Sequence, residues 1–379
     1  MKRILLASVA AATVIAFTGI IDSVIAKVNA ATLTPEQQAL VKKYNISEAD
    51  QKKLFASQPA TARPAQSDRP AKANAASSEK QYPTKAVASA NSRPANGFLA
   101  NTYVWVGADS FKSIGDRLTN INGGTGSLTG SFGAVGGFNS GFGFGDSPIR
   151  FQAGASYGIY DFKGRIRLVP NDTENEKQTF YTVGLYKRGD MSAERDPFSF
   201  GVVYDVFRAE QWGINANNIT LSQVRGIVGY ALTESTEVGV WGAYAVDSDR
   251  AAVTVAGAPG VLRTIHAMNQ TNFYVKQNFA FGGQVTGYVG MLSDSDIGKW
   301  QVGMRGQIPL SANWSAFADA NYVVPRTNAG PLGSGQEQFG VSVGLAYYFG
   351  GNAQNPSVTG NRGLPLLDVA NNRTFLVTD

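Results

Sequence analysis

Hydrophobic and polar residues alternate with a period of two along most of the chain after residue 97. In the stretch QFGVSVGLAYYFGG, residues 338–351, alternate positions from Phe339 to Phe349 are large and apolar, while the positions between them are mostly glycine, serine, glutamine or alanine. A period of two predicts a β-strand. The same pattern predicts twelve strands, at residues 98–109, 131–144, 149–162, 178–188, 198–208, 219–232, 236–246, 271–279, 283–293, 299–310, 313–324 and 337–349.

The connections between these strands tend to alternate between long and short. Long ones follow odd-numbered strands, at residues 110–130, 163–177, 247–270 and 325–336, whereas the short ones include GDSP, TES, AFGG and SA. Such alternation is typical of an up-and-down barrel with short turns on one rim and long loops on the other. The sequence therefore predicts an all-β fold, a 12-stranded antiparallel barrel over residues 98–349.

The composition of the two strand faces indicates a membrane barrel rather than a soluble sandwich, which is the alternative. A soluble barrel points large residues inward and charged residues outward, but here the polar face is rich in glycine, serine, glutamine and asparagine. The apolar face carries aromatic residues that would form interfacial belts in a lipid bilayer. These are Tyr157, Tyr181, Phe198, Tyr204, Tyr230, Tyr244, Trp300, Trp314, Tyr322, Tyr347 and Phe349.

Charge and composition support this interpretation. Only 16% of the 379 residues are charged and 43 are glycine, and the chain contains no cysteine, which suits an oxidising compartment. The formal charge of +5 arises before the barrel, because residues 98–379 carry about −2. Nucleic-acid binding by the barrel is therefore not expected.

The residues before the barrel predict targeting and tethering segments. Lys2 and Arg3 precede an apolar run at residues 4–21, and small residues allow cleavage after Ala26 or Ala30, which predicts a signal peptide over residues 1–30. An uncleaved anchor is the alternative. Residues 31–56 predict a short helical periplasmic segment and residues 57–97 a disordered linker rich in proline, alanine and serine. Residues 350–379 are interpreted as a periplasmic tail.

The last strand carries a more specific signal. The segment VSVGLAYYF resembles the C-terminal strand signature of bacterial outer-membrane barrels, with Val343, Leu345, Tyr347 and Phe349 at the matching positions. Thirty residues follow Phe349, and the final NRTFLVTD is the alternative bearer of this signature. The blocks FSFGVVYDVF, LSQVRGIVGYAL and EVGVWGAY are similar to an uncharacterised family of such barrels. The resemblance implies a location in the bacterial outer membrane, contact with its lipid and recognition by the barrel-assembly machinery.

Strand parity identifies the charged residues that are expected to face the lumen. The functional interpretation is a narrow or partly plugged channel whose guanidinium groups favour small polar or anionic solutes. The alternative is that Asp205 pairs with Arg225, and Asp319 with Arg305, so that ion pairs fill the lumen. The lumen-lining candidates are Arg150, Arg188, Asp205, Arg225, Glu237, Lys276, Arg305 and Asp319.

No enzyme, cofactor or metal site is predicted. His266 is the only histidine and no nucleophile stands in a recognisable setting near it. The second functional hypothesis is a non-conducting structural or adhesive barrel that its basic N-terminal segment tethers to peptidoglycan or to a periplasmic partner.

Overall fold

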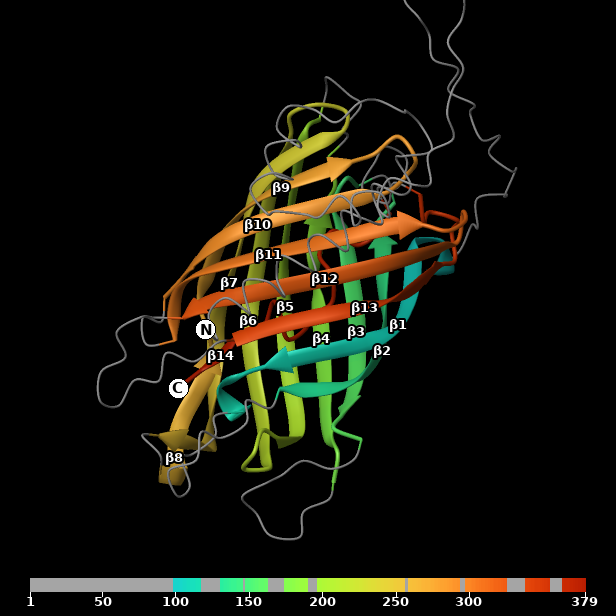
Figure 1. Cartoon of the computed structure of the whole chain (residues 1–379). Helices are drawn as coiled ribbons and strands as arrows, with labels where there is room; N and C mark the ends of the chain where they lie inside the picture. Colours follow the sequence, from blue (N-terminus) through green and yellow to red (C-terminus); the bar gives the residue numbers. More distant parts are fainter. Residues whose placement is uncertain are drawn as a thin grey trace, which may run out of the picture. The chain divides into compact units, whose positions relative to one another are not determined.

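The structure is a closed antiparallel β-barrel of twelve strands (Figure 1). The computed structural model describes residues 98–116, 130–145, 147–162, 174–189, 196–255, 258–293, 297–325, 338–354 and 363–379. The predicted segments at residues 1–30, 31–56 and 57–97 lie outside them. Within the described residues, no helix is both long enough and apolar enough to cross a membrane.

The strands follow the predicted order, with two further strands that are not part of the ring. A short 3₁₀ turn, η1 (Phe98–Asn101), precedes the first strand, and η2 (Ile114–Asp116) follows it. The ring strands are β1 (Thr102–Lys112), β2 (Ser131–Gly143), β3 (Arg150–Tyr160), β4 (Glu176–Lys187), β5 (Phe198–Trp212), β6 (Asn217–Ala231), β7 (Thr236–Val255), β9 (Gln270–Asn278), β10 (Gln284–Leu292), β11 (Gly298–Pro309), β12 (Trp314–Pro325) and β13 (Gln338–Tyr348). The two others are β8 (Ala258–Ala267) and β14 (Val377–Thr378).

Two seams close the ring. Strand β13 pairs with β1, and the first half of β7 pairs with β9, so that β8 is left out of the barrel wall. Closure pairs the edge strands, which removes the open sheet edge that a bilayer cannot satisfy. The predicted 12-stranded antiparallel barrel is therefore confirmed.

The two faces of the strands point as the alternation predicts. In β13, Val341, Val343 and Leu345 are exposed on the outside, while Ser342 and Ala346 are buried inside. Nine of the eleven predicted belt aromatics are exposed on the outer surface: Tyr157, Tyr181, Phe198, Tyr204, Tyr230, Tyr244, Trp300, Trp314 and Phe349. The outer wall is thus apolar and the inner wall polar.

The connection between β7 and β9 differs from the prediction. Residues 247–270 were expected to form a loop, but β7 continues to Val255 and β8 returns beside it as a hairpin. Buried Ala251 and Val253 on β7 and Ile265 on β8 explain the extension, because their side chains join an apolar cluster at this end of the barrel. We call this end the long-loop rim, and the opposite end, where Arg150 begins β3, the short-turn rim.

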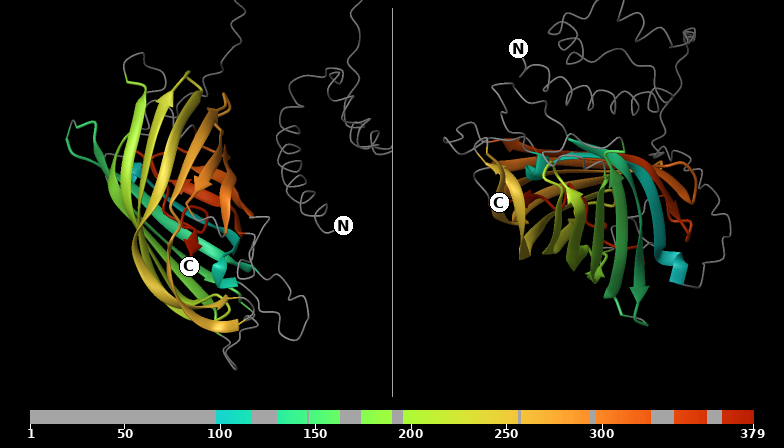
Figure 2. Two further views of the ribbon diagram at one scale, coloured as in Figure 1. Left: turned by 90° about the vertical axis from the view of Figure 1, so that its left-hand side faces the viewer. Right: turned by 90° about the horizontal axis from the view of Figure 1, so that it is seen from below.

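The segment after the last ring strand is also different from the prediction. Residues 350–379 were interpreted as a periplasmic tail, but residues 363–379 lie inside the ring of strands (Figure 2). Leu364, Val369, Ala370 and Phe375 are each no more than 2% exposed, because they pack against inward-facing wall residues. We refer to residues 363–379 as the plug segment.

Candidate functional site

The plug segment crosses the lumen from the short-turn rim to the long-loop rim. Near the short-turn rim, the Tyr186 hydroxyl donates to the carbonyl of Gly363 at 2.5 Å. Further in, the carbonyl of Leu367 accepts from Asn139 and Gln152, each at 2.9 Å. At the far end, β14 pairs with β8. The inward-facing polar side chains of the wall thereby satisfy the backbone of an irregular segment.

Ion pairs hold the middle of the plug segment to one sector of the wall, between β11 and β1. Arg305 on β11 pairs with Asp368, whose carboxylate also accepts from the Tyr103 hydroxyl at 2.9 Å. Arg373 pairs with Asp319 on β12 at 2.9 Å and with Asp109 on β1. The Arg373 side chain is 5% exposed, so its charge is compensated almost without water.

A second network of hydrogen bonds and ion pairs connects neighbouring strands of the wall. Asp205 on β5 accepts from Arg225 on β6 at 2.9 and 3.1 Å, and from Thr182 on β4 at 2.7 Å. Arg225 also donates to the carbonyl of Asp368 at 2.7 Å. This wall pair, which the alternative interpretation of the lumen expected, therefore also binds the plug segment.

The seam between β7 and β9 has its own buried pair. Glu237 and Lys276 are opposite each other in register, and the Lys276 ammonium lies 2.7 Å from the carboxylate. The Tyr274 hydroxyl donates to the same carboxylate at 2.7 Å. Sequence parity placed both charged residues in the lumen but gave no sign that they would pair across the closing seam.

Apolar side chains close the lumen toward the long-loop rim. Phe375 of the plug segment packs against Phe180 and Phe207, with ring centroids 6.2 and 5.4 Å apart. Around them lies a cluster that includes Trp212 at the end of β5 and Met268 just after β8. This end of the barrel resembles the core of a soluble protein more than the mouth of a wide pore.

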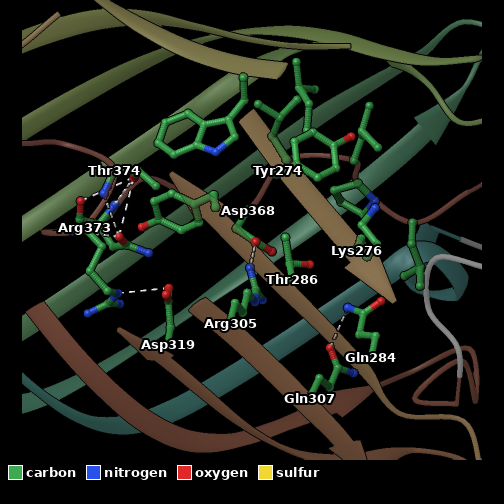
Figure 3. A pocket seen from close by; sticks show the side chains of 18 of the residues that line it. Tyr274, Lys276, Gln284, Thr286, Arg305, Gln307, Asp319, Asp368, Arg373 and Thr374 are labelled. Carbon is green, nitrogen blue, oxygen red and sulfur yellow. Dashed lines mark hydrogen bonds and ion pairs between the residues drawn. The ribbon is translucent and has the colours of Figure 1, made fainter. Parts of the chain in front are cut away.

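A cavity of about 170 Å³ remains in the half of the lumen nearer the short-turn rim (Figure 3). It lies between the wall and the plug segment, and Trp241, Tyr274 and Tyr288 form its aromatic sides. Its charged lining is mostly cationic, with five Lys or Arg and two Asp: Arg188, Arg225, Lys276, Arg305, Arg373, Asp319 and Asp368. A site of this charge attracts anions rather than cations.

The structure separates the eight predicted lumen residues into groups. Five line the cavity: Arg188, Arg225, Lys276, Arg305 and Asp319. Asp205 and Glu237 are buried next to it and hold Arg225 and Lys276, whereas Arg150 begins β3 at the short-turn rim and does not line the cavity. The expected pair of Asp319 with Arg305 is wrong, because each binds the plug segment instead. Their role in conduction stays a prediction.

Sequence reasoning missed the residues that the plug segment contributes. Asp368 and Arg373 were assigned to a tail outside the barrel, and Asp109 was not among the lumen candidates. One signal for the plug segment was present: LPLLDVA and TFLV are too apolar for a solvated tail.

His266, the residue weighed for catalysis, lies on β8 opposite Thr378 of β14. Its ring Nδ1 is 3.0 Å from the carbonyl oxygen of Ala267. The prediction that the protein is not an enzyme stays a prediction.

A family model matches residues 101–377, which is the whole barrel together with the plug segment. The chain belongs to the family of unknown function DUF6666. Because the match extends to residue 377, the DUF6666 region includes Asp368, Arg373 and Phe375, so the plug segment is part of the family's common region. No curated protein matches the chain in sequence.

Solved structures similar to this DUF6666 chain are outer-membrane barrels of low sequence identity. The NanC porin is 8% identical, with a TM-score of 0.37 over 65% of this chain and 98% of the porin. Outer membrane phospholipase A from Escherichia coli is 8% identical, with a TM-score of 0.37 over 65% and 95% of the two chains. The β-domain of the Bordetella autotransporter BrkA is 14% identical, with a TM-score of 0.36 over 66% and 100%.

Proposed function

We propose that the protein spans the bacterial outer membrane as a narrow channel for small polar or anionic solutes, and that its own C-terminal segment keeps the channel plugged. The exposed outer aromatics and aliphatics support the membrane location, since lipid contact selects such a surface. The outer wall would then contact outer-membrane lipid, and the strand signature that ends at Phe349 would be recognised by the barrel-assembly machinery. Peptidoglycan contact through the N-terminal segment stays a prediction about residues outside those described.

One observation carries the channel proposal: the plug segment is bound through ion pairs and hydrogen bonds along most of its length to a polar wall, whose charged residues around the cavity are mostly cationic. Arg305 and Arg225 both bind Asp368, and Arg373 binds Asp319. Withdrawal of the segment would leave the cationic residues lining a passage that favours anions.

A specific observation also favours the second function, a non-conducting structural barrel. The apolar cluster around Phe375 and Trp212 is well packed, and a barrel that never opens would benefit from such a closure. The two functions differ in whether the plug segment can leave.

Single-channel recording in planar bilayers separates them. We expect the full chain to conduct only in rare small steps, and a variant lacking residues 355–379 to show discrete, anion-preferring steps. Replacing Arg225 and Arg305 by glutamine in that variant should reduce the anion preference. Heat-dependent gel migration would establish that each barrel has formed.

A cross-linked full chain provides an independent route if the shortened chain does not fold. The backbone N–H of Ala370 donates to the Thr182 hydroxyl at 2.9 Å, and the chain has no cysteine of its own, so Thr182→Cys with Ala370→Cys is designed to tie the segment to β4. We expect reductant to raise the frequency of opening. Silence of a folded, shortened barrel, or of the reduced double-cysteine chain, would contradict the channel and favour the structural barrel.

A further inference from the structure

Three cations, Arg188, Lys276 and Arg305, line the cavity, and the nearby carboxylates do not provide an ion-pair partner for each of them. Lys276 lies within electrostatic range of both Arg188 and Arg305, and it already shares Glu237 with Tyr274. Among the described residues Arg188 has no carboxylate partner at ion-pair distance; its Nε donates to the carbonyl of Leu364 at 2.8 Å and its Nη2 to that of Pro365. Like charges gathered around a cavity are costly unless an anion joins them.

Arg305 adds a second, independent observation. Its Nη1 pairs with Asp368, but its Nε–H is buried and has no hydrogen-bond partner in the described part of the chain. A buried donor that remains unpaired is costly, and buried polar groups in native proteins are nearly always satisfied. This donor belongs to a residue that lines the cavity.

The remaining lining limits what the cavity can hold. Its volume of about 170 Å³ is close to that of a cavity of roughly 150 Å³ that holds a benzene molecule, so a ligand of about six to nine non-hydrogen atoms fits. Gln284, Thr286 and Gln307 offer hydrogen bonds near Lys276 and Arg305 (Figure 3). These groups suit the hydroxyl or carbonyl of a small polar molecule.

We propose that this cavity is a binding site for a small hydroxycarboxylate, whose carboxylate lies between Arg188, Lys276 and Arg305. The inference deepens the proposed channel by naming the class of solute that it holds. A carboxylate is favoured because the lumen cations already bind this group: Arg225 holds Asp205, Arg305 holds Asp368, and the planar guanidinium fork matches its two oxygens. The solute occupies a further position of this kind, beside the plug segment rather than in place of it.

The test is a calorimetric titration of the detergent-solubilised full chain with L-lactate and with lactamide, a neutral molecule of nearly the same size. We expect saturable binding of lactate and at least tenfold weaker binding of lactamide, since a hydrogen-bonded charge is lost. Arg188→Gln should weaken lactate binding by about tenfold or more, because this residue contributes charge without holding a buried carboxylate. Arg208→Gln is the matched control: it removes the same charge from a side chain that is 65% exposed and outside the cavity, and lactate binding should not change.

Several outcomes would overturn the site. Absence of saturable lactate binding by the folded chain, equal binding of lactamide, or unchanged binding in Arg188→Gln would each do so. If Arg188→Gln does not fold, Arg188→Lys keeps the charge but loses the fork geometry, and it should still weaken binding severalfold. Calorimetry measures binding independently of conduction. A barrel that binds lactate but never conducts would refute the channel and leave the binding site intact. A barrel that conducts but does not bind lactate would refute the binding site and leave the channel intact.

Discussion

Arg305 and Asp319 face each other in register on β11 and β12, yet each is paired with the plug segment and not with the other. Directly opposite residues of an antiparallel pair lie close enough for their side chains to meet. The plug segment therefore replaces one wall pair by two pairs, Arg305 with Asp368 and Arg373 with Asp319. If the segment leaves, the wall can restore its own pair, which lowers the cost of opening.

This exchange predicts that the two plug charges are not independent. Asp368→Asn alone leaves Arg305 without a carboxylate. Arg373→Gln alone removes the ion-pair partner of the buried Asp109 and of the partly exposed Asp319, and breaking a buried pair costs about 3–5 kcal/mol. In the double variant Arg305 and Asp319 can pair directly. We expect the loss in free energy of unfolding to be smaller than the sum of the two single losses by about 1–3 kcal/mol.

Chemical denaturation of the four chains in detergent measures this coupling. Arg208→Gln serves as the control for loss of an exposed charge and should change stability by under about 1 kcal/mol. Losses that add to within about 0.5 kcal/mol would show that the wall does not form the substitute pair.

The closing seam predicts a different cycle. Lys276→Met leaves the Glu237 carboxylate buried, with the Tyr274 hydroxyl of β9 as its one remaining hydrogen-bond partner among the described residues. We expect a loss of about 3–5 kcal/mol in the free energy of unfolding. Adding Glu237→Gln removes the uncompensated charge and should recover most of this loss. The temperature at which the barrel loses its heat-resistant gel migration reports the order of the three variants. A double variant as unstable as Lys276→Met would argue against a charge effect at this seam.

The barrel could be predicted from the sequence, whereas the contents of its lumen could not, for physical reasons that particular residues illustrate. The alternation in β13 arises because one face of the strand points outward and the other into the polar lumen. The residue types alone therefore show that Val343 faces outward and Ser342 inward. The choice of Arg305 between Asp319 and Asp368 depends on where an irregular segment returns in space, and no local period encodes that. The hairpin of β7 and β8 was only partly predictable from the sequence. Val253 and Ile265 are apolar, as a strand facing a core requires, but the alternating stretch around each of them is short.

Phe375 anchors the plug segment near the long-loop rim, and we expect that weakening this anchor releases the segment without unfolding the barrel. Phe375→Ala removes a ring packed against Phe180 and Phe207, a change that costs about 3–5 kcal/mol in a close-packed core. Because Phe375 belongs to the segment and not to the wall, we expect the C-terminal residues to become accessible to protease while the barrel keeps its heat-resistant migration. Mass spectrometry of the products locates the cleavage. Leu345→Ala, on the outer face, is the control and should leave the segment protected from protease. If Phe375→Ala abolishes both this protection and the heat-resistant migration of the barrel, the segment and the barrel form one cooperative unit.

The entry of the plug segment at the short-turn rim depends on a glycine. A Cβ at Gly141 on β2 would meet the carbonyl oxygen of Gly363, a backbone atom that cannot simply rotate away, and the Tyr186 hydroxyl that binds it. Gly141→Ala should therefore push the segment away from the wall at a cost of about 1–3 kcal/mol and speed its proteolysis. The matched control is Gly287→Ala on β10, where an added Cβ would meet nothing within 4 Å, so the same methyl group should leave proteolysis unchanged. Equal protease protection in the two variants would mean that the segment enters the lumen along another path than the one beside β2.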